Sequence, residues 1–335
     1  MAVSLAGKTA IVTGAGSGIN FHFARALLAK RCNVVFADLA LRPEAEELVS
    51  NHRSSSSASA RAIFQKTDVR QWNQLEQMFR VASEELGGAD IVCPGAGVYE
   101  PPFSNFWHPP SSPTSRDDPS SNTYASLAIN LSHPIRTTQL AISHFLSPPS
   151  SSSTSPVSAS NPKAIIHISS IAGQVTPFAV PIYNAAKHGI NGFVRSLAPL
   201  SHRLGVRVTA VAPGVIKTPL WTENPDKLRL IKDGDAWVTP EYVAETMVAL
   251  VEDEEIQVSG GERAIGSGAQ SGDSRGGTRR VTVQGGMIVE VAKGTRRIVE
   301  QFNDPGPSGE GNTVSGMGIA EEEIFGALKG GWGVS

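Results

Sequence analysis

The sequence predicts a single α/β domain in which a doubly wound parallel sheet is covered by helices on both faces. Two observations support this prediction: short apolar runs alternate with segments of helical periodicity, and most of those runs lack the polar alternation of a half-exposed strand. Of the 335 residues, 40% are hydrophobic, so the chain can bury a large core. Repeated β-α alternation places successive strands in parallel, with crossover helices between them.

Seven apolar runs are interpreted as buried strands. The first consists of Ala, Ile and Val between two threonines and leads directly into a glycine-rich turn. The sixth leads into Pro213 and Gly214, which end it. The predicted strands span residues 9–13, 33–37, 62–64, 91–93, 164–168, 206–211 and 287–291. The expected sheet therefore has seven parallel strands.

Between these strands, apolar residues recur every three or four positions, which is typical of helices with one buried face. Leu75, Met78 and Phe79 form one such stripe. Thr239 followed by Pro240 has the N-cap and first-position residues that favour a helix start. The predicted helices cover residues 19–30, 44–50, 72–82, 124–145, 182–204 and 240–252.

Four polar stretches interrupt this pattern, and we expect them to be flexible surface insertions because they have little apolar surface to bury. Three are rich in serine, with proline in two of them, and the fourth is rich in glycine and serine. They lie near residues 54–60, 109–121, 147–162 and 259–277. We expect residues 1–300 to form the domain, and residues 301–335 to form a glycine-rich C-terminal extension with a short amphipathic piece at 321–328.

The composition disfavours several classes of protein. Lys and Arg number 29 against 31 Asp and Glu, a net charge of −2, so no basic surplus is available for nucleic-acid phosphates. Cys32 and Cys93 are far apart, so neither a disulfide framework nor a metal site is expected. The longest uncharged stretch, 164–186, carries several polar side chains, and the chain does not open on a signal-peptide pattern. We therefore expect no membrane span and a cytoplasmic location.

The turn between the first strand and the first helix contains Gly14, Gly16 and Gly18. Glycines there let the backbone approach a pyrophosphate, whose charge is favoured at a helix N-terminus. Asp38, 20 residues after Gly18, ends the second strand; its carboxylate can bind a ribose 2′-hydroxyl and repel a 2′-phosphate. This pattern predicts NAD(H) in preference to NADP(H). Arg42, four residues after Asp38, keeps the NADP alternative open.

A second group of residues predicts acid–base chemistry. Tyr183 and Lys187 are four positions apart and share one face of a predicted helix. A nearby ammonium favours the phenolate and lowers the phenol pKa from about 10. Ser170, 13 residues before Tyr183, follows the fifth strand, so its hydroxyl can hold a carbonyl oxygen beside the phenol. Such a tyrosine can act as general acid or base for a hydroxyl–carbonyl pair.

With these residues in place, the sequence resembles the short-chain dehydrogenase/reductase family over about residues 5–255 and the strand near 285–291. The matching motifs follow the order and spacing of that family. They are Thr13-Gly14-x-x-x-Gly18-Ile19, Asp68-Val69, Ala96-Gly97, Asn130, Ile168-Ser-Ser-x-Ala-Gly173, Tyr183-x-x-x-Lys187, and Pro213-Gly214 followed by Thr218. Within the family the sequence is similar to fungal NAD-linked hydroxyprostaglandin-dehydrogenase-like members. The resemblance implies a Rossmann-fold domain that assembles as a homodimer or homotetramer.

The resemblance also implies roles for individual residues. Tyr183 exchanges the proton, Lys187 binds the nicotinamide ribose and tunes Tyr183, and Ser170 orients the substrate. Asn130 holds a water in a proton relay. Asp68 and Val69 flank the adenine, and Thr218 meets the carboxamide. The implied cofactor-binding residues are Gly14, Ser17, Gly18, Ile19, Asp38, Asp68, Val69, Ala96, Gly97, Tyr183, Lys187, Pro213, Gly214, Val215 and Thr218.

Two departures from the family pattern bear on the cofactor. Asn20 stands where the family has glycine, and Pro94-Gly95 replaces the usual two asparagines before Ala96. Asparagine adds a side chain at the contact between helix and nucleotide, so we expect both departures to weaken or reshape cofactor binding. Neither removes a catalytic group.

The sequence thus predicts an NAD(H)-dependent oxidoreductase that interconverts a secondary alcohol and a ketone of a small, mostly apolar molecule. Two alternatives remain: an NADP-dependent ketoreductase of secondary metabolism, and a nucleotide-binding sensor that has lost catalysis. Aromatic residues near the site are compatible equally with an apolar substrate pocket and with loop packing or a subunit contact. These residues are Tyr99, Phe103, Phe106, Trp107, Trp221 and Trp237.

Overall fold

The computed structural model describes most of the chain. The described residues are 3–53, 60–147, 154–228, 231–259, 277–301, 322 and 325–329. Most of the predicted insertions at 54–60 and 259–277, part of that at 147–162 and most of the extension at 301–335 lie outside the described residues. The insertion at 109–121 is described and is a loop with one turn of 3-10 helix, Pro119–Ser121.

The central sheet has eight strands in the order β10-β9-β6-β5-β4-β1-β2-β3. The seven predicted strands, β1 to β6 and β9, all pair in parallel, which confirms the predicted parallel sheet. The eighth, β10, was not predicted and pairs antiparallel with β9 across a tight turn at Gly294, whose φ is +70°. The strands are β1 (Thr9–Thr13), β2 (Asn33–Asp38), β3 (Ala62–Lys66), β4 (Ile91–Cys93), β5 (Lys163–Ile168), β6 (Val206–Pro213), β7 (Glu255–Ser259), β8 (Thr278–Thr282), β9 (Ile288–Ala292) and β10 (Thr295–Ile298).

The helices fall close to their predicted places, with two differences. The helix expected at 182–204 is two helices, because Pro199 has no N–H to donate and its ring disrupts a continuous helix. The helix expected at 124–145 contains a π-helical turn at Ala128–Ser132. The α-helices are α1 (Gly18–Ala29), α2 (Pro43–Asn51), α3 (Trp72–Leu86), α4 (Ala125–Leu127), α5 (His133–Leu146), α6 (Pro181–Ser196), α7 (Pro199–Leu204), α8 (Pro219–Thr222), α9 (Pro225–Leu228) and α10 (Pro240–Glu252).

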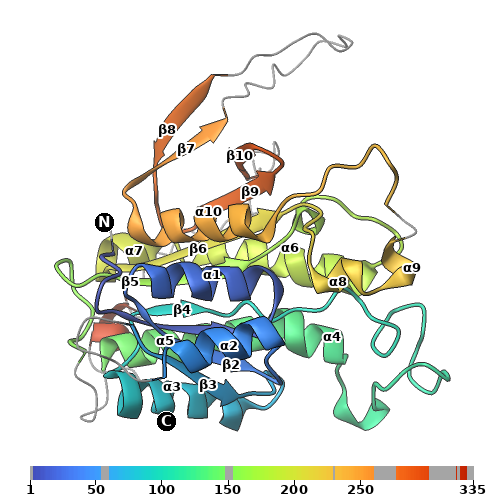
Figure 1. Ribbon diagram of the computed structural model, residues 1–335, viewed down its shortest axis with the longest axis horizontal. Helices are drawn as coiled ribbons and strands as arrows, with labels where there is room; N and C mark the ends of the chain where they lie inside the picture. Colours follow the sequence, from blue (N-terminus) through green and yellow to red (C-terminus); the bar gives the residue numbers. More distant parts are fainter. Residues whose placement is uncertain are drawn as a thin grey trace, which may run out of the picture.

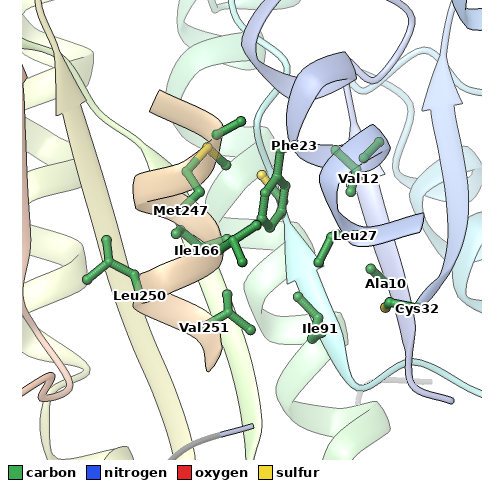
Figure 2. Packing of buried hydrophobic residues seen from close by; sticks show 14 of the residues in the cluster. Ala10, Val12, Phe23, Leu27, Cys32, Ile91, Ile166, Met247, Leu250 and Val251 are labelled. Atoms are coloured by element: carbon green, nitrogen blue, oxygen red, sulfur yellow. The ribbon is translucent and has the colours of Figure 1, made fainter. Parts of the chain in front are cut away.

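Two apolar layers fasten helices to the two faces of the sheet (Figure 1). On one face α1, α2 and α10 bury their apolar residues against the strands, and on the other face α3, α5 and α6 do so. Figure 2 shows Phe23 and Leu27 of α1 packing beside Met247 of α10, next to Ile166 of β5. These layers bury the sheet on both faces, as the uninterrupted apolar strands predict.

The strands β7 and β8 form a separate antiparallel hairpin that projects from the body of the protein (Figure 1). Ile256 and Val258 of β7 are buried, while Glu255 and Gln257 between them are exposed. The sequence prediction missed this hairpin because neither strand is an uninterrupted apolar run: β7 starts within the charged residues 252–255, and β8 has two arginines among its five residues.

Part of the C-terminal extension packs against the domain. Phe325 and Leu328 are buried in the same apolar layer as α5 and α6. The Arg203 guanidinium of α7 lies 4.1 Å from the ring centre of Phe325 and pairs with Glu322 at 2.6 Å. None of the helices in the described ranges is both long and apolar enough to cross a bilayer.

The topology places a crevice at one edge of the sheet. The strand order reverses beside β1, which lies between β4 and β2. The chain continues from β1 into α1 on one face of the sheet, and from β4 toward α5 on the other face. In open α/β sheets, ligands bind at such a switch point. The turns that follow these two strands meet closely, since a Cβ on Gly14 would lie 2.8 Å from the Ala96 Cα.

Candidate active site

A cavity of about 610 Å³ opens at this switch point. It extends from the glycine turn after β1 to Tyr183 and Lys187 of α6 and to α8. Of the predicted site residues, two do not line it: Asn130 and Val215. The predicted residues that line it are Gly14, Ser17, Gly18, Ile19, Asp38, Asp68, Val69, Ala96, Gly97, Ser170, Tyr183, Lys187, Pro213, Gly214 and Thr218.

The glycine turn has a shape that side chains would prevent. Gly14 and Gly18 have φ values of +72° and +58°, in the left-handed region that favours glycine. A Cβ on Gly16 would lie 2.3 Å from the Ala40 carbonyl oxygen. Helix α1 begins at Gly18, so its unpaired N–H groups face the cavity and favour an anion there. The turn therefore fits a dinucleotide pyrophosphate.

Asp38 lies at the rim of the cavity beside this turn. Its carboxylate accepts hydrogen bonds from the backbone N–H of Gly16 at 2.8 Å and of Leu39 at 2.7 Å. Burial raises the pKa of Asp38, and these backbone hydrogen bonds oppose that change. Arg42, the residue that kept the NADP alternative open, forms an ion pair with Glu223. Its guanidinium therefore already has a carboxylate partner, although the pair is exposed and weak.

Asp68 and Val69 line the same end of the cavity. The Arg70 guanidinium donates to both carboxylate oxygens of Asp68 and holds the pKa of that carboxyl below its usual range. Arg70 also lines the cavity, but its charge is paired. The residues at this end can thus enclose an adenosine without offering it a free cation.

The two departures from the family pattern prove to be complementary. A Cβ on Gly95 would lie 2.3 Å from the Asn20 Oδ1, and a Cβ on Gly14 would lie 2.9 Å from the Asn20 Nδ2. The Asn20 amide therefore fills the space between the two turns, and Gly95 leaves room for it. The expectation that these departures weaken or reshape cofactor binding stays a prediction.

This packing predicts the outcome of a residue exchange. Gly95→Asn alone places its Cβ against Asn20, and overpacking of this kind costs about 1–3 kcal/mol of stability. The double variant Asn20→Gly/Gly95→Asn removes the clash, so we expect it to regain most of the lost thermal stability and NAD(H) affinity. Melting temperature and fluorescence titration measure both. If the effects of the two substitutions simply add, the complementarity is refuted.

Tyr183 and Lys187 lie on the first two turns of α6, and Ser170 lies just beyond β5. Ser170 hydrogen-bonds to Tyr183, which lowers the phenol pKa, but burial acts more strongly and raises the pKa of Tyr183 to about 12. Burial also lowers the pKa of Lys187 to about 8. The expected lowering of the Tyr183 pKa is thus reversed in the free chain, because the phenol is desolvated.

Lys187 is positioned by the end of β5. Its ammonium donates to the Ile168 carbonyl oxygen at 2.8 Å and lies 5.4 Å from the ring centre of Tyr183. The side chain is 5% exposed and lines the cavity. An ammonium held here faces both the phenol and whatever occupies the cavity.

Sequence reasoning missed Glu100, which positions the start of α6. Its buried carboxylate accepts hydrogen bonds from the backbone N–H of Tyr183 at 2.9 Å and of Phe106 at 3.1 Å. A carboxylate at a helix N-terminus satisfies an otherwise unpaired N–H and complements the helix dipole. No local signal marks it, because Glu100 and Tyr183 are far apart in the sequence.

Asn130 lies in the π-helical turn and is buried. Its side-chain amide exchanges two hydrogen bonds with the backbone of Val98, at 3.0 and 2.9 Å. The side chain therefore fixes the segment after β4, and its role in a proton relay stays a prediction. Near the end of β6, Ile216 lines the cavity in place of the predicted Val215.

The aromatic residues divide into two groups. Phe103 and Trp221 line the cavity, and the Tyr99 ring lies 4.8 Å from the Tyr183 ring and 5.3 Å from that of Trp221. Trp107 instead packs on Phe178 at 4.5 Å, at an exposed surface. The first group forms an apolar wall beside Tyr183.

Comparisons with known proteins identify the family of this chain. A family model described as short chain dehydrogenase matches residues 8–229. The 15-hydroxyprostaglandin dehydrogenase [NAD(+)] of Rattus norvegicus is 28% identical over 262 residues, covering 74% of this chain and 87% of the relative. The D-beta-hydroxybutyrate dehydrogenase of Cupriavidus necator is 30% identical over 231 residues, covering 69% of this chain and 78% of the relative.

The fold is also similar to that of a solved structure, the 3-ketoacyl-(acyl-carrier-protein) reductase of Brucella melitensis complexed with NADH. The TM-score is 0.57 at 23% sequence identity, over 74% of this chain and 92% of the other. At this identity the match supports the fold alone: a parallel central sheet flanked by helices.

Proposed function

The chain belongs to the short-chain dehydrogenase family, and on that premise we propose that it is an NAD(H)-dependent oxidoreductase that interconverts a secondary alcohol and a ketone. The observation that supports this proposal is the arrangement of Ser170, Tyr183 and Lys187 in one cavity with the glycine turn and Asp38. The two relatives described above, which are named for hydroxylated substrates and one for NAD(+), support the same reaction class.

The proposed roles follow from the positions of the side chains. A bound NAD⁺ would supply the acceptor for the hydride that leaves the carbinol carbon. Ser170 holds the substrate oxygen beside the phenol, and Tyr183 takes its proton during oxidation and returns it during reduction. Lys187 supplies positive charge that favours the phenolate and binds the nicotinamide ribose. Asn130 keeps the segment after β4 in place for a proton relay.

A turnover screen tests the proposed function. Purified protein is mixed with NAD⁺ and a panel of secondary alcohols, or with NADH and the matching ketones, and absorbance of the reduced nicotinamide is followed. We expect turnover with members of both panels. Cofactor binding without turnover on any member contradicts the proposal and favours the sensor alternative.

Asp38 provides the prediction on cofactor choice. A unit charge 4 Å from a like charge is repelled by about 4 kcal/mol at an effective dielectric constant of 20, and less where solvent screens it. We therefore expect kcat/KM with NAD⁺ to exceed that with NADP⁺ by at least ~10²-fold, and Asp38→Ala to narrow the ratio. Equal values in the unmodified protein contradict this prediction and favour the NADP alternative.

By the same family membership we propose a homodimer or homotetramer and a cytoplasmic location. We also propose that residues 1–300 form the catalytic domain and that 301–335 are an extension of it. The family supports the assembly and the location, and the sequence pattern supports the division at residue 300. The packing of Phe325 and Leu328 supports the view that part of the extension is docked on the domain.

A further inference from the structure

Lys227 of α9 places an ammonium close to the catalytic tyrosine. Its Nζ lies 5.3 Å from the ring centre of Tyr99, and the Tyr99 ring packs edge-on against that of Tyr183 with 4.8 Å between centres. Only one aromatic ring therefore separates the ammonium from the phenol. Lys227 does not itself line the cavity; its ammonium contacts the carbonyl oxygen of Leu220, and Leu220 does line it.

No carboxylate balances this charge within the described part of the chain. The Lys227 ammonium donates a long hydrogen bond, 3.5 Å, to the carbonyl oxygen of Leu220. Burial lowers the pKa of Lys227, and no acidic group opposes that change. Lys163 pairs with Asp90 at 2.5 Å and Lys30 with Glu252 at 2.6 Å. Lys187 beside the phenol resembles Lys227 instead: its ammonium donates to a backbone carbonyl, and no ion pair with a carboxylate is formed by it among the described residues.

A half-buried ammonium without a counter-ion is unfavourable unless a ligand supplies one. The ammonium also makes a cation–π contact with the Tyr99 ring, which attracts the charge but does not neutralise it. Leu220, whose carbonyl the ammonium contacts, lines the cavity, as do Trp221 and Phe103. The wall between the phenol and the ammonium is therefore apolar, with a cation at its edge.

We propose that Lys227 binds a carboxylate of the substrate, so that the preferred substrate is a hydroxy acid or oxo acid with an apolar body between its two functional groups. The inference rests on the proposed oxidoreductase function and deepens it. In the bound state the hydroxyl lies at Ser170 and Tyr183, the body lies along Trp221, and the carboxylate reaches the ammonium of Lys227. The carboxylate contact adds to substrate binding and leaves the proposed alcohol–ketone interconversion as described above.

The test compares acids with their neutral esters. Secondary hydroxy acids of increasing chain length, each paired with its methyl ester, are oxidised with NAD⁺, and kcat and KM are measured separately. We expect kcat/KM to favour one or more acids over their esters by roughly 10- to 100-fold, the range of one charge-assisted hydrogen bond. Lys227→Met should remove that preference by raising KM for the acids, and Lys227→Arg should restore part of it.

Two further variants make the assignment specific. Lys217→Met removes the same charge from an exposed position in the same segment, and we expect it to change neither acid nor ester kinetics. Arg116 also lines the cavity, and its guanidinium forms no hydrogen bond or ion pair within the described ranges. If Arg116→Gln abolishes the acid preference and Lys227→Met leaves it, the assignment to Lys227 is wrong.

The remaining outcomes separate the two proposals. Turnover of esters and neutral alcohols as fast as of acids overturns the carboxylate site and leaves the proposed oxidoreductase function standing. Absence of turnover on every member, with NADH still bound, refutes the proposed function itself. As a control, NADH fluorescence titration of each variant checks whether the cofactor site and the fold are intact.

Discussion

Replacing Tyr183 with phenylalanine is expected to lower kcat by ~10²- to 10⁴-fold while leaving NAD(H) affinity nearly unchanged. The variant keeps the ring, and with it the packing on Tyr99 at 4.8 Å, and loses only the hydroxyl that hydrogen-bonds to Ser170. Steady-state kinetics measure the loss, and fluorescence titration with NADH measures the affinity.

The pH profile adds a second readout. Tyr183 is an acid with a pKa of about 12 in the free chain, so its phenolate fraction increases as pH rises toward that value. The oxidation rate should therefore rise with pH in the unmodified protein, and this rise should be missing from the residual activity of Tyr183→Phe. Tyr242→Phe, on α10 away from the cavity, is the matched control. Turnover near the normal rate in Tyr183→Phe contradicts the mechanism.

Lys187→Met should impair both catalysis and cofactor binding. Methionine retains much of the side-chain length but removes the ammonium that donates to Ile168 and lies 5.4 Å from the Tyr183 ring. We expect kcat to fall about 10²-fold, because a phenol without nearby positive charge ionises less readily. NAD(H) affinity should fall about tenfold through the loss of one charge-assisted hydrogen bond.

The sign of the pH effect separates Lys187 from Tyr183. The ammonium is present below its pKa of about 8 and is lost above it, whereas the phenolate fraction grows up to about 12. In the unmodified protein the rising kcat/KM for oxidation should therefore bend near pH 8. Lys187→Met should show a lower profile without that bend. A bend that persists in the variant would assign it to another group.

The predicted parts of the fold are those whose signal is local in the sequence. The seven parallel strands are short runs of mostly apolar residues, and the crossover helices carry apolar stripes, so each element could be recognised by itself. Strand β10 (Thr295–Ile298) has two arginines in four residues and depends on β9 for its pairing. The break at Pro199 was missed because the apolar spacing continues across it.

The candidate site divides in the same way. The glycine turn and the Tyr183–Lys187 pair are each contained within a few residues, so their geometry follows from one turn or one helix. The contacts that adjust the site join distant segments. Asn20 meets Gly95, Glu100 caps the helix of Tyr183, and Lys227 reaches Tyr99. The pKa of Tyr183 was mispredicted for a related reason, since burial depends on the whole fold.

The ion pair between Arg42 and Glu223 affects how easily the two chain segments that it joins can separate. Arg42 precedes α2 and Glu223 follows α8, so the pair joins two chain segments that each contribute to the cavity lining, through Leu39 and Trp221. Exposed pairs of this kind contribute about 0–1 kcal/mol and weaken as salt screens them. The two segments can therefore separate at little cost in free energy, and more readily at higher ionic strength. Under the proposed function, a contact this weak is compatible with repeated release and binding of the dinucleotide.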